Sequence, residues 1–149
     1  MSQVSLVDML LGEHGVLYAL FNKIEALDKD ASLDTVQGSI AVLSATLVSH
    51  AMLEEELLFS KLEQHIGAGG PLMVMRAEHE QIEGTLQNLP KISDAVQALR
   101  VVKETCGLAR DHFAKEENIL FPLARQTLGD EKLAELGGEW SRRREVVVA

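Results

Sequence analysis

The chain is poor in the residues that interrupt helices or cross-link a fold. Only three prolines occur among its 149 residues, and the single cysteine, Cys106, excludes an internal disulfide. Aromatic residues make up only 4% of the chain. Leucine, alanine and glutamate are common, and these residues favour helices over strands. We interpret Cys106 as a small buried core residue, which is compatible with a reducing compartment.

Basic charge is also scarce, since the formal net charge is -9 at pH 7. This balance argues against a nucleic-acid-binding surface and against binding to an anionic membrane. No apolar run approaches the roughly 20 residues that span a bilayer, and the N-terminus lacks the pattern of a signal peptide. We therefore expect a cytoplasmic protein with no nucleic-acid or membrane partner, folded as a single domain over residues 1–149.

Apolar residues recur every three or four positions along four long segments, which is typical of amphipathic helices. The predicted helices cover residues 5–27, 33–66, 72–89 and 95–127. Ser32 or Asp34 can cap the second helix, and Ser93 or Asp94 the fourth.

Helix breakers separate these segments and predict the fold class. A glycine-rich stretch ending at Pro71 closes the second helix, Pro90 closes the third, and Pro122 predicts a kink within the fourth. The prediction is an all-α fold, an up-down-up-down four-helix bundle over residues 5–128. A short helical extension follows over residues 129–149, with Trp140 as its packing anchor.

Two segments, His50–Phe59 and His112–Phe121, share the pattern His-x-x-x-Glu-Glu-x-x-Leu-Phe. Residues four apart lie on one face of a helix, so each copy directs an imidazole and a carboxylate to the same side. His14, His79 and Glu83 lie on the apolar faces of the other two helices. Helix lengths place these groups at similar depths, except that His112 lies roughly two turns too deep relative to His79.

Imidazoles and carboxylates buried without counter-ions would be costly, so their convergence predicts a metal site. The alternative is a polar core in which each group is satisfied by hydrogen bonds. The candidate ligands are His14, His50, Glu54, His79, Glu83, His112 and Glu116. This set lacks thiolates, which suits iron, manganese or zinc, and it is too large for one tetrahedral zinc. It favours two cations bridged by carboxylates.

The chain resembles the hemerythrin-like family, also called the HHE cation-binding domain, from about Leu10 to Leu123. The motifs that carry the resemblance are Glu13-His14, His50-x-x-x-Glu54, Glu78-His79 and His112-x-x-x-Glu116. It implies a four-helix bundle with a non-haem centre of two iron ions, favoured over manganese or zinc. Such centres bind dioxygen or related molecules such as nitric oxide or peroxide.

The same resemblance implies a role for each ligand. Glu54 and Glu116 would bridge the two irons, together with an oxo or hydroxo group. One iron would be held by His14 and His50. The other would be held by His79 and His112, with Glu83 as a further ligand.

Two features depart from the oxygen-carrying members of that family. Glu83 replaces a histidine, and the acid facing the site after His112 is Glu116, four residues on rather than five. Glu117 would point about 100° further round the helix. An anionic Glu83 would favour ferric iron, which favours oxidase, peroxide or sensing chemistry over reversible oxygen carriage.

Three function classes follow from these features. The first is a di-iron protein that binds a small molecule for sensing, storage or detoxification. The second is a di-iron enzyme with peroxidase, catalase-like or ferroxidase activity. The third is a helical interaction module whose metals are structural. The sequence leaves open whether the protein is an enzyme and which protein partner it has.

Several other polar residues lie close to the predicted ligands in sequence. Tyr18, one turn after His14, is a candidate hydrogen-bond donor beside the site, with a core aromatic as the alternative. Glu55, Glu56 and Glu117 are interpreted as solvated faces; hydrogen bonding to a ligand imidazole is the alternative.

Overall fold

The computed structural model describes residues 4–147, and every regular element in that range is helical. The elements are α1 (Leu6–Glu25), α2 (Leu33–Glu54), η1 (Glu55–Phe59), α3 (Ser60–Ile66), α4 (Pro71–Asn88), η2 (Leu89–Lys91), α5 (Ala95–Lys115), η3 (Glu116–Leu120) and α6 (Phe121–Arg144). Two of the short elements, η1 and η3, are π-helical turns, and η2 is a 3-10 turn. The all-α class is as predicted.

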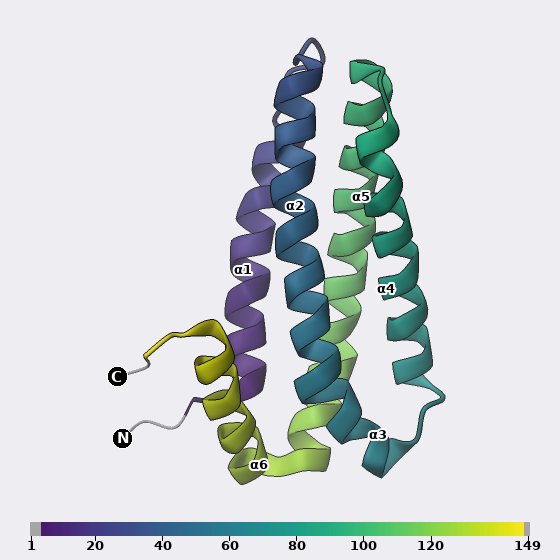
Figure 1. Ribbon diagram of the computed structural model, residues 1–149. Coiled ribbons are helices and arrows are strands. Elements are labelled where there is room, and N and C mark those ends of the chain that lie inside the picture. The colour runs from purple at the N-terminus through teal and green to yellow at the C-terminus, as the bar shows by residue number, and fades with distance from the viewer. Residues whose placement is uncertain (1–3, 148–149) are drawn as a thin grey trace.

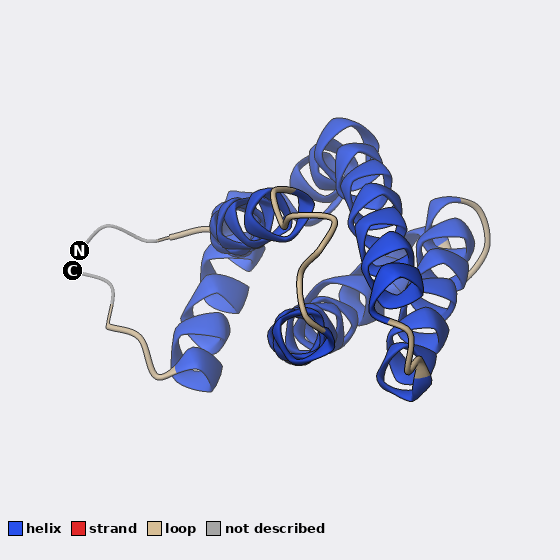
Figure 2. Ribbon diagram, turned by 90° about the horizontal axis from the view of Figure 1, so that it is seen from above, coloured by secondary structure: helices blue, strands red, loops and turns tan. Residues whose placement is uncertain are grey.

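Four long helices, α1, α2, α4 and α5, lie side by side, and short connections join α1 to α2, α3 to α4 and α4 to α5 (Figures 1 and 2). α2, η1 and α3 follow one another without a loop, so they continue one another down the bundle. The last part of α6 leaves the base of the bundle and returns along α1 (Figure 1).

Local signals account for most helix ends. Side chains of Ser5, Ser32 and Asp94 accept hydrogen bonds from backbone N–H groups in the first turns of α1, α2 and α5. Gly67, with φ 80°, ends α3 in a backbone conformation that favours glycine, and Pro71 begins α4. Ser32, Asp94, the glycine-rich stretch and Pro71 are among the residues that the sequence predicts for those ends, whereas a capping role of Ser5 was not predicted.

The fourth helix differs from the prediction near Pro122. The regular helix ends earlier, at Lys115, and a π-helical turn follows. Pro122 then falls in the first turn of α6, where its missing N–H is tolerated. The sharp change of direction comes instead at Gly129, whose φ of 79° and ψ of 167° are not helical.

The predicted two-turn mismatch between His79 and His112 is removed by the connection between α4 and α5. The turn η2 has about 2.0 Å rise per residue, against 1.5 Å in an α-helix. Ile92 and Asp94 have extended backbones, with ψ of 116° and 117°. The chain therefore climbs further before α5 begins, and the rings of His79 and His112 meet with centroids 4.6 Å apart.

Two apolar clusters fill the bundle, one above and one below a polar layer. One cluster contains Leu10, Leu53 and Met75, and the other contains Leu17, Leu47 and Ile82. On each of the three helices the histidine lies between these paired positions. The bundle therefore holds its polar groups at mid-height, with apolar side chains on both sides.

One helix meets a criterion that the sequence analysis did not recognise. Residues Leu33–Ile66 form a helix that contains an 18-residue window with a mean hydropathy of 1.4, so by length and composition it could cross a membrane. Core helices of soluble bundles pass the same test. This helix carries the buried groups His50 and Glu54 into the bundle interior.

Candidate metal centre

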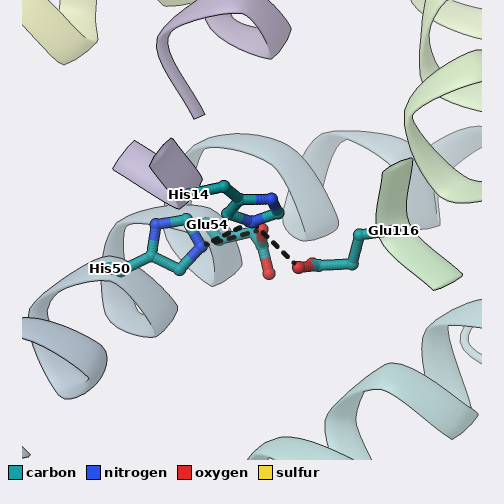
Figure 3. Close-up of side chains that lie close together, drawn as sticks. All are labelled: His14, His50, Glu54 and Glu116. Carbon is teal, nitrogen blue, oxygen red and sulfur yellow. Dashed lines mark hydrogen bonds and ion pairs between the residues drawn. The ribbon is translucent and has the colours of Figure 1, made fainter. Parts of the chain in front are cut away.

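Six of the seven predicted ligands come together in the polar layer. His14, His50, Glu54 and Glu116 offer four donor atoms that lie within 4.8 Å of one another (Figure 3). A second group of the same kind consists of Glu54, His79, His112 and Glu116. Because both carboxylates belong to both groups, the arrangement has the form of two adjoining cation sites with shared carboxylates.

The histidine Nε2 atoms and carboxylate oxygens that face the interior lie close enough together to coordinate the same metal ions. His14 Nε2 lies 3.2 Å from His50 Nε2 and 3.3 Å from Glu116 Oε1. On the other side, Nε2 of His79 is 3.3 Å from Glu54, and Nε2 of His112 is 3.4 Å from Glu116. All four histidines thus direct Nε2 toward the two carboxylates.

These groups are buried, and several lack hydrogen-bond partners. Glu54 and Glu116 are 0% exposed. Both oxygens of each carboxylate, and Nε2 of His112, are buried without any hydrogen-bond partner. An unsatisfied carboxylate in a protein interior costs several kcal/mol. Cations between the carboxylates would remove that cost, so the donor set fits a pair of metal ions.

The electrostatics of the two carboxylates support this reading. Burial and the facing Glu54 carboxylate raise the pKa of Glu116 well above its ordinary value. Burial also opposes ionisation of Glu54, but the neighbouring Glu116 carboxyl group and the imidazoles of His50 and His79 outweigh it and lower the pKa of Glu54. The protonated form is therefore favoured at Glu116 and the ionised form at Glu54, and a bound cation would favour the ionised form of both.

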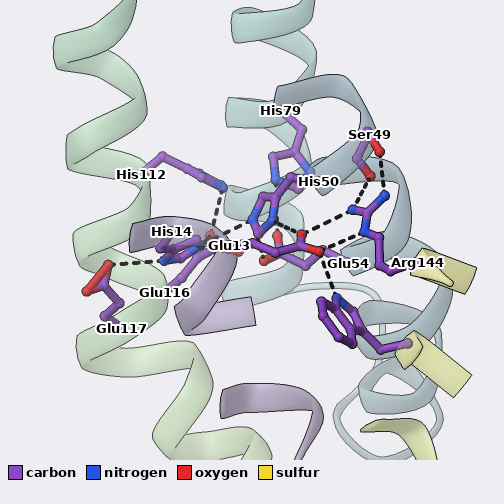
Figure 4. Close-up of polar contacts among 11 residues, drawn as sticks. Glu13, His14, Ser49, His50, Glu54, His79, His112, Glu116, Glu117 and Arg144 are labelled. Carbon is purple, nitrogen blue, oxygen red and sulfur yellow. Dashed lines mark hydrogen bonds and ion pairs between the residues drawn. The ribbon is translucent and has the colours of Figure 1, made fainter. Parts of the chain in front are cut away.

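Carboxylates also hold the outer nitrogens of three histidines (Figure 4). The Nδ1 atoms of His14, His50 and His112 lie 3.1, 2.8 and 3.2 Å from oxygens of Glu117, Glu13 and Glu78, respectively. Such carboxylate–histidine pairs fix the tautomer with the Nε2 lone pair facing the metal, and they increase its basicity.

The pKa values of the two adjacent histidines of α1 and α2 are shifted in opposite directions. Burial and the neighbouring His50 lower the pKa of His14 to about 4. Burial also works against the charge of His50, but hydrogen bonds to Glu13 and Glu54 raise its pKa to about 9. Glu13 is stabilised as an anion: burial opposes this, yet hydrogen bonds from His50 and Arg144 hold its pKa at about 2.

The roles of Glu13, Glu78 and Glu117 were missed by the sequence analysis or left as an alternative. Glu13 and Glu78 directly precede His14 and His79, but each contacts a histidine of another helix. A side chain one residue along a helix points about 100° round, toward the neighbour rather than into the centre. The dipeptides Glu13-His14 and Glu78-His79 were therefore the sequence signal for these contacts between helices. Glu117, interpreted as solvated, takes the alternative role.

Tyr18, the candidate donor beside the site, reaches the site indirectly. Its hydroxyl donates to Glu117 Oε2 at 2.5 Å, and the same oxygen lies 3.1 Å from His14 Nδ1. Burial and the Glu117 carboxylate raise the pKa of Tyr18, so the phenol stays protonated.

Glu83 is the one predicted ligand that the structure does not place in either donor group. It lines a small interior cavity of about 20 Å³, together with His79 and His112. It also lines a groove of about 430 Å³ between α2 and α4. Located one turn after His79, Glu83 therefore lies where the interior cavity and the surface groove adjoin.

The π-helical turns occupy equivalent places in the two motif copies. η1 begins just after Glu54, and η3 begins at Glu116. Phe59, the last residue of η1, and Phe121, which directly follows η3, each stack on a histidine of another helix. Phe59 lies 5.4 Å from His79 and Phe121 lies 5.5 Å from His14, measured between ring centroids.

Comparison with known proteins identifies a matching family and a set of relatives. The family model described as Hemerythrin HHE cation binding domain matches residues 5–124. No solved structure matches the chain.

Three of the relatives carry the printed name iron-sulfur cluster repair protein YtfE. The protein from Enterobacter sp. (strain 638) is 33% identical over 98 residues, covering 57% of this chain and 44% of the relative. Those from Escherichia coli O139:H28 (strain E24377A / ETEC) and Shigella boydii serotype 18 (strain CDC 3083-94 / BS512) are 32% identical with the same coverage. The chain thus spans less than half the length of these relatives.

Proposed function

Because the chain belongs to the hemerythrin HHE cation-binding domain family, we propose that it is a di-iron protein that binds a small molecule. The ligand is dioxygen, nitric oxide or peroxide, bound for sensing, storage or detoxification. The site lies within an up-down-up-down bundle formed by a single domain, with residues 129–149 as an extension. Alternative activities of the same centre are peroxidase, catalase-like or ferroxidase turnover.

The observation that carries the proposal is the pair of unsatisfied carboxylates at the meeting point of two histidine pairs. Glu54 and Glu116 are fully buried, lack hydrogen-bond partners, and belong to both donor groups. A polar core satisfied by internal hydrogen bonds would not leave these four oxygens unpaired.

The proposed ligands are six residues, and each has a role set by its place. Glu54 and Glu116 would bridge the ions; His14 and His50 would hold one ion; His79 and His112 would hold the other. Bound iron supplies electrons and open coordination positions for dioxygen or a related molecule. The outer carboxylates hold the histidine rings in position, and the apolar clusters above and below exclude bulk water.

Access to the site is proposed between α2 and α4. The groove of about 430 Å³ and the interior cavity of about 20 Å³ share Val48, Ala51, His79 and Glu83 as lining residues. A cavity of about 20 Å³ accommodates about one water-sized molecule. The position of Glu83 at this junction supports a role in controlling access rather than in binding the metal.

Metal analysis with visible spectroscopy tests the proposal. We expect two irons per chain in protein purified from iron-supplemented cells, with an absorption band that changes on adding oxygen, peroxide or nitric oxide. The variant Glu83→Ala should keep both irons. A colourless protein holding only zinc would instead support a structural metal in an interaction module.

Turnover assays then separate binding from catalysis. Multiple turnovers of peroxide, or continued oxidation of ferrous iron, would identify an enzyme. A single stoichiometric spectral change would identify a binding protein. Replacing Glu116 by alanine provides the control, because any activity of the centre should disappear with its shared carboxylate.

A second candidate is suggested by the name of the relatives, iron-sulfur cluster repair. The observation that favours it is the partial exposure of His79, whose side chain is 13% exposed while the other ligands are at most 3% exposed. Iron would leave from the His79 side. Transfer of iron from the loaded protein to a cluster-free acceptor protein, faster than to buffer alone, tests this role.

We also propose a soluble, cytoplasmic location. The long helix Leu33–Ile66 meets the composition of a membrane span, yet its inward face carries two of the proposed ligands. Many of its apolar residues pack into the two clusters of the bundle, whereas Val42 and Met52 are exposed. Fractionation of cells expressing the protein tests the location.

A further inference from the structure

Residues after Gly129 lie outside the family match but reach the metal centre. The match ends at residue 124. After the turn at Gly129, the remaining part of α6 packs against α1 through Leu133, Leu136 and Trp140, which belong to the lower apolar cluster. Gly137 permits a close approach, because a Cβ there would lie 1.8 Å from the carbonyl oxygen of Val4.

The far end of this segment binds Glu13, the carboxylate that holds His50. Arg144 donates from Nε to Glu13 Oε2 at 2.8 Å and from a terminal nitrogen to Oε1 at 3.1 Å (Figure 4). Trp140 donates its indole N–H to Glu13 Oε2 at 2.7 Å. Glu13 Oε1 in turn lies 2.8 Å from His50 Nδ1.

Arg144 also ties the segment to α2. One terminal nitrogen donates to Ser49 Oγ at 2.6 Å, and the other donates to the Ser49 carbonyl oxygen at 3.3 Å. Ser49 directly precedes His50. A single guanidinium therefore holds both the backbone beside the ligand and the carboxylate that orients its ring.

Glu117 and Glu78, which lie against Nδ1 of His14 and His112, have different hydrogen-bond donors from Glu13. Glu117 accepts from Tyr18 within the matched family domain, and its side chain is 30% exposed. Glu78 accepts from Lys115, also within that domain, and is 21% exposed. Glu13 is 15% exposed and receives its donors from the C-terminal segment. The segment thus acts on one side of the centre, the side of His14 and His50.

From these contacts we infer that Arg144 and Trp140 are positioning residues of the metal centre. By fixing Glu13, and through it His50, the docked C-terminal segment sets how firmly the His14–His50 side holds its metal ion. The inference rests on the proposed di-iron function. It differs from a purely structural role, in which the segment only covers the apolar outer face of α1.

Two variants and a matched control test the inference. Arg144→Met removes the guanidinium and keeps the side-chain length, while Trp140→Phe removes the N–H donor and keeps an aromatic ring. Arg142→Met is the control, because Arg142 binds Glu139 on the same helix and makes no bond to Glu13. Arg144→Lys, which keeps a positive charge and hydrogen-bond donors, should behave more like wild type than Arg144→Met does.

The first measurement is iron release from the loaded protein to excess chelator. In Arg144→Met and Trp140→Phe we expect the first iron to leave about 10-fold faster. This is the lower end of the roughly 10–100-fold loss of affinity that follows removal of a ligand's own hydrogen-bond partner, because these variants loosen Glu13 without removing it. The release of the second iron should change much less. Release unchanged from wild type, or equal acceleration of both ions together with a lowered melting temperature, would overturn the inference.

The second measurement uses metal-free protein, so it does not depend on the proposed function. The ring Nδ1–H resonance of His50 should be visible by NMR in wild type and Arg142→Met, and broadened or shifted in Arg144→Met and Trp140→Phe. An unchanged resonance would overturn the inference even if iron binds. If wild type binds no iron, the proposed function fails while this measurement still decides the positioning role.

Discussion

Individual residues in the polar layer divide into those that face the centre and those that hold the facing groups. The division follows from helix geometry: residues four apart share a face, whereas adjacent residues point about 100° apart. The sequence was sufficient to predict the inward pairs at His50 and His112. It was not sufficient for Glu13 and Glu78, because their partners are on other helices and depend on how the helices pack.

The neighbouring acids Glu116 and Glu117 give the sharpest contrast at this scale. Glu116 is buried within both donor groups, whereas Glu117 accepts hydrogen bonds from His14 and Tyr18. Glu116→Ala should lose or loosen both metals. Glu117→Ala should keep them, with affinity reduced about 10-fold. Iron content after gel filtration is the measurement; equal content in both variants would show that the shared carboxylate is wrongly assigned.

Cys106 was predicted to be a buried core residue, and it is 0% exposed. Burial and the nearby Glu25 raise the pKa of its thiol to about 12. A raised thiol pKa lowers the thiolate fraction, to roughly 1 in 10,000 at pH 8, and only the thiolate reacts readily. Native protein should therefore resist iodoacetamide at pH 8, as followed by mass spectrometry, while urea-unfolded protein is fully modified. Rapid modification of the native protein would contradict this account.

At the scale of elements, the two π-helical turns distinguish this bundle from four regular helices. A π turn adds one residue to a helix without changing the faces of the helix on either side, and such turns often occur at functional sites. Here they let a carboxylate and a phenylalanine five residues later both point inward. No simple spacing rule predicts a π turn, so the sequence analysis assigned the irregularity to Pro122 instead.

Deletion of one exposed residue from η3 tests the purpose of the π turn. Removing Asn118 should convert η3 to α-helix while leaving the downstream apolar face in register, so the metal-free protein should still fold. Iron affinity should fall at least about 10-fold, because Glu116, the first residue of η3, loses the backbone position that the π turn gives it. Circular dichroism and iron content provide the measurements.

A deletion in a regular helix provides the comparison. Removing exposed Glu104 from α5 would rotate all following residues by about 100° and turn His112 and Glu116 away from the core. This variant should fail to fold cooperatively. If both deletions destabilised the metal-free protein equally, the π turn would not be the dispensable extra residue that this account requires.

For the whole molecule, much of the fold and of the centre could be predicted from the sequence. Capping residues, glycines and prolines fixed the ends of the long helices, and the repeated His-x-x-x-Glu pattern marked the centre. The predicted di-iron cofactor agrees with family membership and with the two donor groups. The placement of Glu83 and the reach of Arg144 depend on packing between distant segments, which no local pattern contains.

Metal removal should destabilise the whole molecule, because the polar layer lies between its two apolar clusters. A ligand present at 100 times its dissociation constant stabilises the folded state by about 2.7 kcal/mol, which corresponds to about 5–10 °C in melting temperature for a chain of this size. Chelated protein should therefore melt at least that much lower than iron-loaded protein. Glu116→Gln provides the control, because a neutral amide resembles the protonated carboxyl group of metal-free Glu116. Its metal-free form should melt near the metal-free wild type, and iron should not raise that temperature. Equal melting of chelated and loaded wild type would mean that the buried carboxylates are stable without cations.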